Sequence, residues 1–154
     1  MDAAYTTKEL LSVLCSKDKK ESYGALDELE ATAECSEQLC KKHFETVVRL
    51  LQNENSFVRN RAARLVSIMS KRIDADKMAS AMPAYLHLLH DEKPITVRMC
   101  LQNLPVIIKA HPELCRVKSK VVSEADFSKH KDSMSPLLIK DAKAVMEFID
   151  SNNT

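Results

Sequence analysis

Apolar residues recur along the chain at spacings of three and four, the periodicity of an amphipathic α-helix. One such stripe consists of Phe44, Val47, Val48 and Leu51. Polar segments that contain good helix-capping residues separate the stripes. The pattern predicts an all-α protein with eight helices at about 6–15, 18–35, 37–52, 55–72, 74–90, 94–110, 112–125 and 134–151.

Short-range signals support several of these boundaries. The segment Thr6–Glu9 has the Thr-x-x-Glu sequence of a capping box. Good N-capping residues precede three further helices, namely Ser36, Asn55 and Asp74. Two prolines, Pro83 and Pro105, fall inside predicted helices. Because proline lacks a backbone N–H and clashes with the preceding turn, we expect each of them to kink its helix.

The even-numbered helices of this set resemble one another. The segment 57–65 matches 96–104 at an offset of 39 residues, and weaker copies extend to both ends. One column is basic, with Lys20, Arg59, Arg98 and Lys140. The first apolar column contains Val58, Val97 and Ile139 and is interrupted by Lys19. The second contains Leu26, Leu65, Leu104 and Met146, and the third contains Leu29, Ile68, Ile107 and Ile149. A single helix pair of this size cannot bury its apolar stripe alone, so the copies are expected to stack around a continuous core.

A leucine-rich first helix, a turn with Asn or Asp, and a second helix that opens with Val-Arg form the repeated pattern. Its best copies contain Leu50-Leu51, Asn55, Val58-Arg59, Ala62-Ala63 and Leu65, then Leu88-Leu89-His90-Asp91, Val97-Arg98 and Leu104. This pattern resembles that of the HEAT-repeat family (HEAT/armadillo-like α-solenoids). The resemblance implies a right-handed α-α superhelix of four stacked helix pairs. It implies one domain over 1–154, with repeats at about 6–35, 37–72, 74–110 and 112–151, in which the arginine pairs with a turn acid of a neighbouring repeat.

Glycine is almost absent, with one residue among 154. Glycine-rich phosphate loops, dinucleotide-binding fingerprints and nucleophile elbows all need glycine where the backbone approaches a ligand or takes a strained conformation. The composition therefore argues against these enzyme classes. The lone Gly24 falls inside the predicted helix 18–35. We expect close contact with a neighbouring helix to explain it, because glycine weakens a helix interior.

Candidate chemistry is sparse. The five cysteines, Cys15, Cys35, Cys40, Cys100 and Cys115, are odd in number and scattered, which favours reduced thiols and a cytoplasmic location. No signal peptide or membrane-spanning segment is predicted. The close pairs are His87 with His90, His111 with Cys115, and Cys40 with His43. Each pair offers only two ligands where zinc takes three or four, so neither a metal, a cofactor nor a catalytic residue is predicted.

Charge is nearly balanced overall but uneven along the chain. Residues 1–36 hold four basic and eight acidic residues, whereas residues 37–73 hold eight basic and three acidic ones. Attraction between neighbouring helices is one interpretation. A groove that is acidic at one end and basic in the middle, and that suits a charged peptide or protein, is the other.

The resemblance also implies which residues meet a partner, because the second helices of HEAT-like repeats line the concave face. With Val58, Ala62, Leu65 and Met69 directed inward, we expect Asn60, Arg61, Arg64 and Ser67 to be more exposed. The matching rows in the neighbouring copies contain Met99, Cys100, Gln102 and Asn103, and Glu21, Ser22, Ala25 and Glu28. The polar segment 123–134 lengthens the last repeat and is either a second candidate surface or a disordered excursion.

These observations predict a non-catalytic protein-interaction or scaffold module that binds a partner protein or peptide on its concave face. The alternative is a nucleic-acid-binding or DNA-repair protein like the HEAT-like alkylpurine DNA glycosylases. The near-neutral charge and the absence of tryptophan disfavour that alternative. A third possibility is an accessory lyase or maturation factor, but no local motif supports it.

Overall fold

The computed structural model describes residues 6–114 and 120–152, and every regular element within these ranges is a helix. The α-helices are α1 (Thr7–Leu14), α2 (Lys19–Cys35), α3 (Glu37–Leu50), α4 (Ser56–Met69), α5 (Ala75–Leu86), α6 (Pro94–Ala110) and α8 (Ser135–Asn152). Three short 3-10 helices follow α4, α5 and α6, namely η1 (Ser70–Arg72), η2 (His87–His90) and η3 (Pro112–Leu114).

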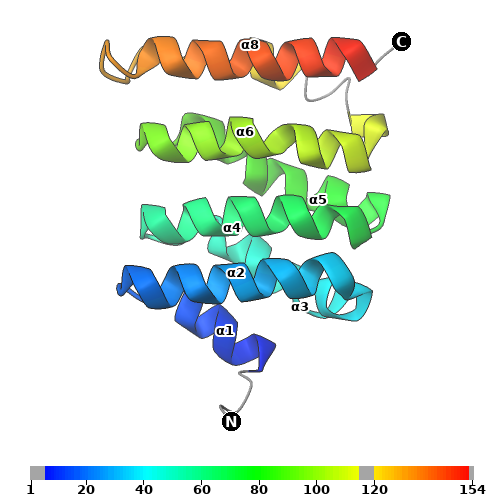
Figure 1. Cartoon of the computed structure of the whole chain (residues 1–154). Helices are drawn as coiled ribbons and strands as arrows, with labels where there is room; N and C mark the ends of the chain where they lie inside the picture. The colour runs from blue at the N-terminus through cyan, green and yellow to red at the C-terminus, as the bar shows by residue number, and fades with distance from the viewer. Residues whose placement is uncertain (1–5, 115–119, 153–154) are drawn as a thin grey trace.

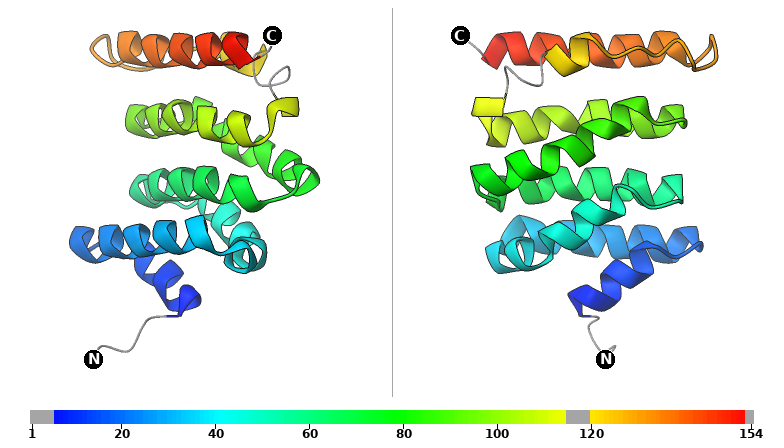
Figure 2. Two further views of the ribbon diagram at one scale, coloured as in Figure 1. Left: turned by 45° about the vertical axis from the view of Figure 1, so that its right-hand side comes forward. Right: turned by 180° about the vertical axis from the view of Figure 1, so that it is seen from behind.

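The helices form two layers. Helices α2, α4, α6 and α8 lie side by side and run in the same direction (Figure 1). Helices α1, α3 and α5 cross behind them, and the view from behind shows these three in front (Figure 2). Helices α1 and α8 lie at opposite ends of the molecule. The N-terminal ends of α2, α4 and α6 all lie along the same edge of the row.

A single apolar core runs through the whole row, from Leu10 in α1 to Ile149 in α8. Its middle is filled by long side chains such as Met82, Tyr85 and Leu101, which have no exposed surface. Tyr85 is accommodated because its hydroxyl donates a hydrogen bond of 2.7 Å to the carbonyl of Cys100. Each helix of one layer thus covers the apolar stripe of the other, which is what the periodicity predicted.

Four predicted helix starts are confirmed by their caps. The Thr6 hydroxyl accepts from the Glu9 N–H at 3.2 Å, and the Glu9 carboxylate accepts from the Thr6 N–H at 3.1 Å, which completes the capping box. Ser36, Asn55 and Asp74 also cap helices with their side chains. These caps satisfy N–H groups that have no partner within the helix, so they fix where each helix begins.

The two internal prolines lie at different places in their helices. Pro83 lies three residues before the end of α5, after which the chain continues as the 3-10 helix η2. Pro105 lies in the middle of α6, which continues to Ala110.

The predicted helix at 112–125 is only partly correct. Residues 112–114 form η3, residues 120–123 are helical, and residues 125–127 are not. Residues 115–119, which include Cys115, lie outside the described part of the chain. The segment 123–134 contains turns, and it packs on the core through Phe127, whose side chain is buried. Of the two alternatives for this segment, a disordered excursion therefore does not describe Phe127.

The repeat register holds in the middle of the row and shifts at the ends. Val58, Leu65, Val97 and Leu104 are buried, as their columns predicted. In α8 the buried residues are Leu138, Val145 and Ile149, whereas Ile139 is 46% exposed. The aliphatic column is thus wrong by one position there, because a terminal helix contacts a neighbour on one side only and is less constrained in its rotation.

The opposite end shows a similar departure. The buried residues of α2 precede those of α4 by 36 residues rather than 39, and they are Ser22, Ala25, Leu26, Leu29 and Ala33. Gly24 is exposed, and a Cβ atom added to it would meet no atom within 4 Å apart from its chain neighbours and the backbone of its own helix. The expectation that Gly24 permits a close helix contact is therefore wrong.

Candidate binding groove

A groove of about 400 Å³ crosses three parallel helices, over the middle of α2 and the N-terminal halves of α4 and α6. We call it the α2–α4–α6 groove, and its lining residues are Tyr23, Leu26, Asp27, Glu30, Phe57, Asn60, Arg61, Arg64, Ile95 and Met99. Because α2, α4 and α6 run in the same direction, the first turns of all three meet at one edge of the row (Figure 1).

Each of the three helices contributes one large apolar side chain that remains half exposed. Tyr23 of α2 is 52% exposed, Phe57 of α4 is 49% exposed and Ile95 of α6 is 53% exposed. The ammonium group of Lys19 lies 5.5 Å from the centre of the Phe57 ring. Scattered exposed apolar residues are ordinary, but three around one groove form a surface that a partner could cover favourably.

Arg61 lies on the wall of this groove and is almost fully buried, with 5% of its surface exposed. The sequence-based expectation that Arg61 is exposed is therefore wrong. Its Nη1 donates a 3.0 Å hydrogen bond to the carbonyl of Leu14, the last residue of α1. The guanidinium also lies 5.3 Å from the centre of the Tyr23 ring. A helix C-terminus attracts a cation and leaves carbonyls without partners, which explains why Arg61 turns inward.

The Arg61 guanidinium is nevertheless incompletely satisfied. Its Nε is buried and has no hydrogen-bond partner among the described residues. No carboxylate in the described ranges forms an ion pair with it. Arginine stays charged at any physiological pH, so this is a buried charge that no carboxylate of the described residues balances.

Neighbouring cations are paired across the helices. Arg64 of α4 forms an ion pair with Glu30 of α2, and Lys71 pairs with Glu34 at 3.0 Å. Arg72 donates to the backbone carbonyl of Glu34. The acidic first quarter of the chain and the basic second quarter thus attract each other, which confirms the first interpretation of the uneven charge.

The structure brings together only part of the predicted site. Asn60, Arg61, Arg64 and Met99 line the groove, and the Asn60 side-chain carbonyl accepts a 2.6 Å hydrogen bond from Thr96. The remaining predicted residues lie outside the lining, namely Glu21, Glu28, Ser67, Gln102 and Asn103.

Ser67 was expected to be exposed and is buried, so that expectation is wrong. Its hydroxyl donates to the carbonyl of Arg64 at 2.6 Å, which lets a polar side chain face the neighbouring helix α6. Sequence reasoning missed Tyr23, Phe57 and Ile95. The signal available for Phe57 and Ile95 was a large apolar residue in the first turn of a helix and outside the buried stripe.

The basic column lies outside the groove, and its member Arg59 lies beside the turns that connect the helices. Arg59 donates to both carboxylate oxygens of Asp91, at 2.8 and 2.9 Å. Its Nη1 also donates to the carbonyls of Asn53 and Glu54, at 2.9 and 3.1 Å. We call these four residues the turn cluster. It joins the α3–α4 turn to the turn before α6, which agrees with the pairing that the family resemblance implies.

The other members of the basic column behave differently. Arg98 pairs with Asp141 at 2.8 Å, and this partner lies on helix α8 rather than in a turn. Lys20 and Lys140 are exposed, and neither forms an ion pair with a described residue. The column is therefore structural in its two central copies.

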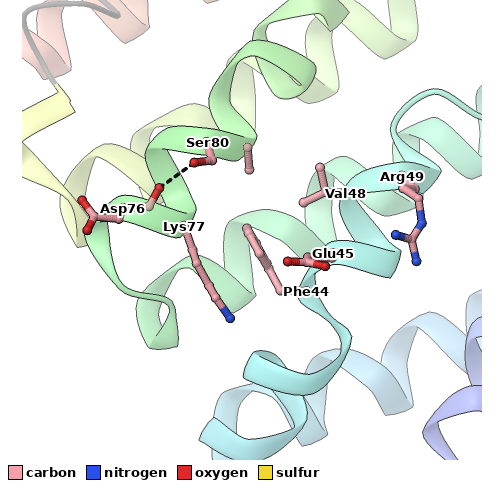
Figure 3. A pocket seen from close by; sticks show the side chains of 8 residues that line it. Phe44, Glu45, Val48, Arg49, Asp76, Lys77 and Ser80 are labelled. Carbon is pink, nitrogen blue, oxygen red and sulfur yellow. Dashed lines mark hydrogen bonds between the residues drawn. The ribbon is translucent and has the colours of Figure 1, made fainter.

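A second hollow, of about 430 Å³, lies in the other layer between α3 and α5. Figure 3 shows Glu45 and Lys77 beside Phe44, with Arg49 and Asp76 at its two ends. Phe44 is 2% exposed and already belongs to the core. This hollow is thus lined by charged residues around a buried aromatic ring, whereas the large apolar side chains of the α2–α4–α6 groove are half exposed.

The thiols and imidazoles do not converge. Within the described ranges, no three His, Cys, Asp or Glu residues lie close enough together to hold a metal ion. Burial raises the pKa of the thiols of Cys15, Cys40 and Cys100, which makes them poorer nucleophiles. Of the predicted pairs, His111 with Cys115 includes a residue outside the described part of the chain.

No protein-family model matches this chain, and no curated protein matches it significantly. None of the helices in the described part has the length and apolar character that a bilayer crossing requires.

Proposed function

We propose that this protein is a non-catalytic interaction module, built as a short HEAT-like solenoid, that binds a partner protein or peptide in the α2–α4–α6 groove. The observation that carries the proposal is the position of Tyr23, Phe57 and Ile95. Each is about half exposed, and all three surround one groove. A partner that covers them would remove this apolar surface from water, at about 25 cal/mol per Å² before the costs of association.

The proposed HEAT-like architecture rests on three features. The even-numbered helices run parallel in one row, α4 and α6 repeat the same buried positions at an offset of 39 residues, and Arg59 bonds to the acid of the next turn. Solenoids of this kind bind partners along an extended face. A partner protein fits the groove better than nucleic acid does, because Arg64 and Lys71 are paired with carboxylates and do not form a sustained basic surface.

The test uses the full chain as bait in affinity capture from its native lysate, with quantitative mass spectrometry. The groove variant is Phe57→Ala with Ile95→Ala. The matched control is Leu137→Ala with Ile139→Ala, because these α8 residues are also exposed and apolar but lie outside the groove. We expect the groove variant to lose at least about tenfold of the specific partner, since two well-placed apolar contacts are worth more than about 1.4 kcal/mol.

The control variant is expected to capture as much partner as the unmodified chain. Retention of every partner by the groove variant would contradict the proposal, as would an equal loss in the control. Circular dichroism of both variants checks that the helices are intact.

A further inference from the structure

We propose that the α2–α4–α6 groove recognises a peptide segment in which a carboxylate lies next to large apolar side chains, and that Arg61 pairs with this carboxylate. The inference rests on the proposed function, since it names the chemistry of the partner for the same groove. It is carried by a second observation, the buried guanidinium on the groove wall.

The hydrogen bonds of Arg61 leave room for an anion. A guanidinium has five N–H donors, and the carbonyl of Leu14 is the one acceptor that Arg61 finds among the described residues. No described residue accepts a hydrogen bond from its buried Nε. Since Arg61 is one of the groove-lining residues, the small part of it that stays accessible faces the groove. A carboxylate held there would supply the acceptors that the described residues do not.

The charges around Arg61 favour a single carboxylate over a polyanion. Arg64 is neutralised by Glu30, and Asp27 adds another carboxylate to the α2 side of the groove. A phosphate backbone, which places a charge on every nucleotide, would meet these two acids. A single carboxylate that is flanked by apolar side chains would pair with Arg61 without approaching these two acids.

The apolar residues of the groove determine which side chains are expected beside that carboxylate in the peptide. The Tyr23 ring lies against the Arg61 guanidinium, whereas Phe57 and Ile95 stand on the next two helices. Three adjacent helices span two steps of about 10 Å each, so an extended segment of about six residues crosses them. The expected occupant is therefore a short peptide that combines Asp or Glu with aliphatic or aromatic residues.

The experiment selects binders to the full chain from a displayed library of random octapeptides. For one selected peptide and its Glu→Gln or Asp→Asn counterpart, calorimetry then gives the affinity for three proteins. These are the unmodified chain, Arg61→Met, and the control Arg49→Met. The control removes the same charge from an exposed arginine outside the groove. We expect neutralising the peptide acid to weaken binding about tenfold in the unmodified chain and in the control, and to have no effect in Arg61→Met.

The outcomes separate this inference from the proposed function. Peptides that need Phe57 and Ile95 but contain no acid, or whose acid dependence persists in Arg61→Met, would overturn the role of Arg61 and leave the groove as a binding site. A library that yields no groove-dependent peptide would overturn both. Selection of peptides that compete with duplex DNA would favour phosphate recognition and contradict the inference. Arg61→Lys keeps the charge and covers the case in which Arg61→Met fails to fold.

Discussion

Arg59 and Arg61 are two residues apart on α4, but they lie in regions that differ in how many of the guanidinium donors have an acceptor. In the turn cluster, Arg59 meets a carboxylate and two backbone carbonyls. In the groove, Arg61 has one carbonyl and an aromatic ring and lacks a described counter-charge. The first arrangement joins elements of the chain to one another. The second leaves donors without a described acceptor, so the two arginines differ in how far the described part of the chain satisfies them.

The largest expected effect breaks the turn cluster. Arg59→Met leaves the mostly buried Asp91 carboxylate and two turn carbonyls without their donor, so we expect the free energy of unfolding to fall by about 2–3 kcal/mol. Arg61→Met removes a buried charge that no described carboxylate balances, so the free energy of unfolding should fall by less than about 1 kcal/mol. Urea denaturation followed by far-ultraviolet circular dichroism measures both. Equal losses would contradict the comparison.

A smaller effect concerns Tyr85, another polar group whose partner lies within the chain. Tyr85→Phe removes its hydrogen bond to the Cys100 carbonyl, which should cost about 1 kcal/mol. Burial raises the pKa of Tyr85 well above its ordinary value of about 10. Because the folded chain holds this proton more tightly than the unfolded chain, the stabilisation is complete below about pH 10 and declines as the pH rises above it.

Denaturation at several alkaline pH values measures this slope. We expect Tyr85→Phe to be less sensitive to alkaline pH than the unmodified chain. Tyr23→Phe is the matched control, since this tyrosine lies in the groove and is half exposed. The same loss of slope in the control would show that the effect does not come from the core tyrosine.

The smallest expected effect is a gain. Gly24→Ala places a methyl group where nothing lies within 4 Å, and alanine is the better helix former. We expect the free energy of unfolding to rise by about 0.5–1 kcal/mol, with no change in groove binding. Thermal and urea denaturation measure the gain. A loss of stability would indicate a close neighbour at this position and would restore the sequence-based interpretation.

Most helix positions could be predicted from the sequence because their causes are local. Ser36, Asn55 and Asp74 bond to N–H groups two or three residues away, and apolar stripes are visible within one helix. The register at the ends could not be predicted in the same way. Whether Leu138 or Ile139 faces the core depends on how α8 rotates against its one neighbouring helix in the row.

The groove was harder to predict than the helices. The burial of Arg61 depends on the Leu14 carbonyl, which is 47 residues away in the sequence. The ion pair of Arg64 with Glu30 likewise joins residues that are 34 apart. A helical pattern identifies which side of α4 faces the core, but it does not show where a neighbouring helix ends or which atoms that end presents.

The ion pairs between neighbouring helices of the row have a consequence for the order in which the protein opens. Helix α2 is joined to η1, which follows α4, by the surface pair Glu34–Lys71, both about half exposed, whereas the Arg59–Asp91 pair of the turn cluster is mostly shielded. Dissolved ions screen exposed charges far more than shielded ones. We therefore expect added salt to loosen the α2–α4 boundary first, and amide hydrogens in α1 and α2 to exchange ahead of those in α4 and α6. Ionic strength would then act on the same boundary that forms one wall of the groove.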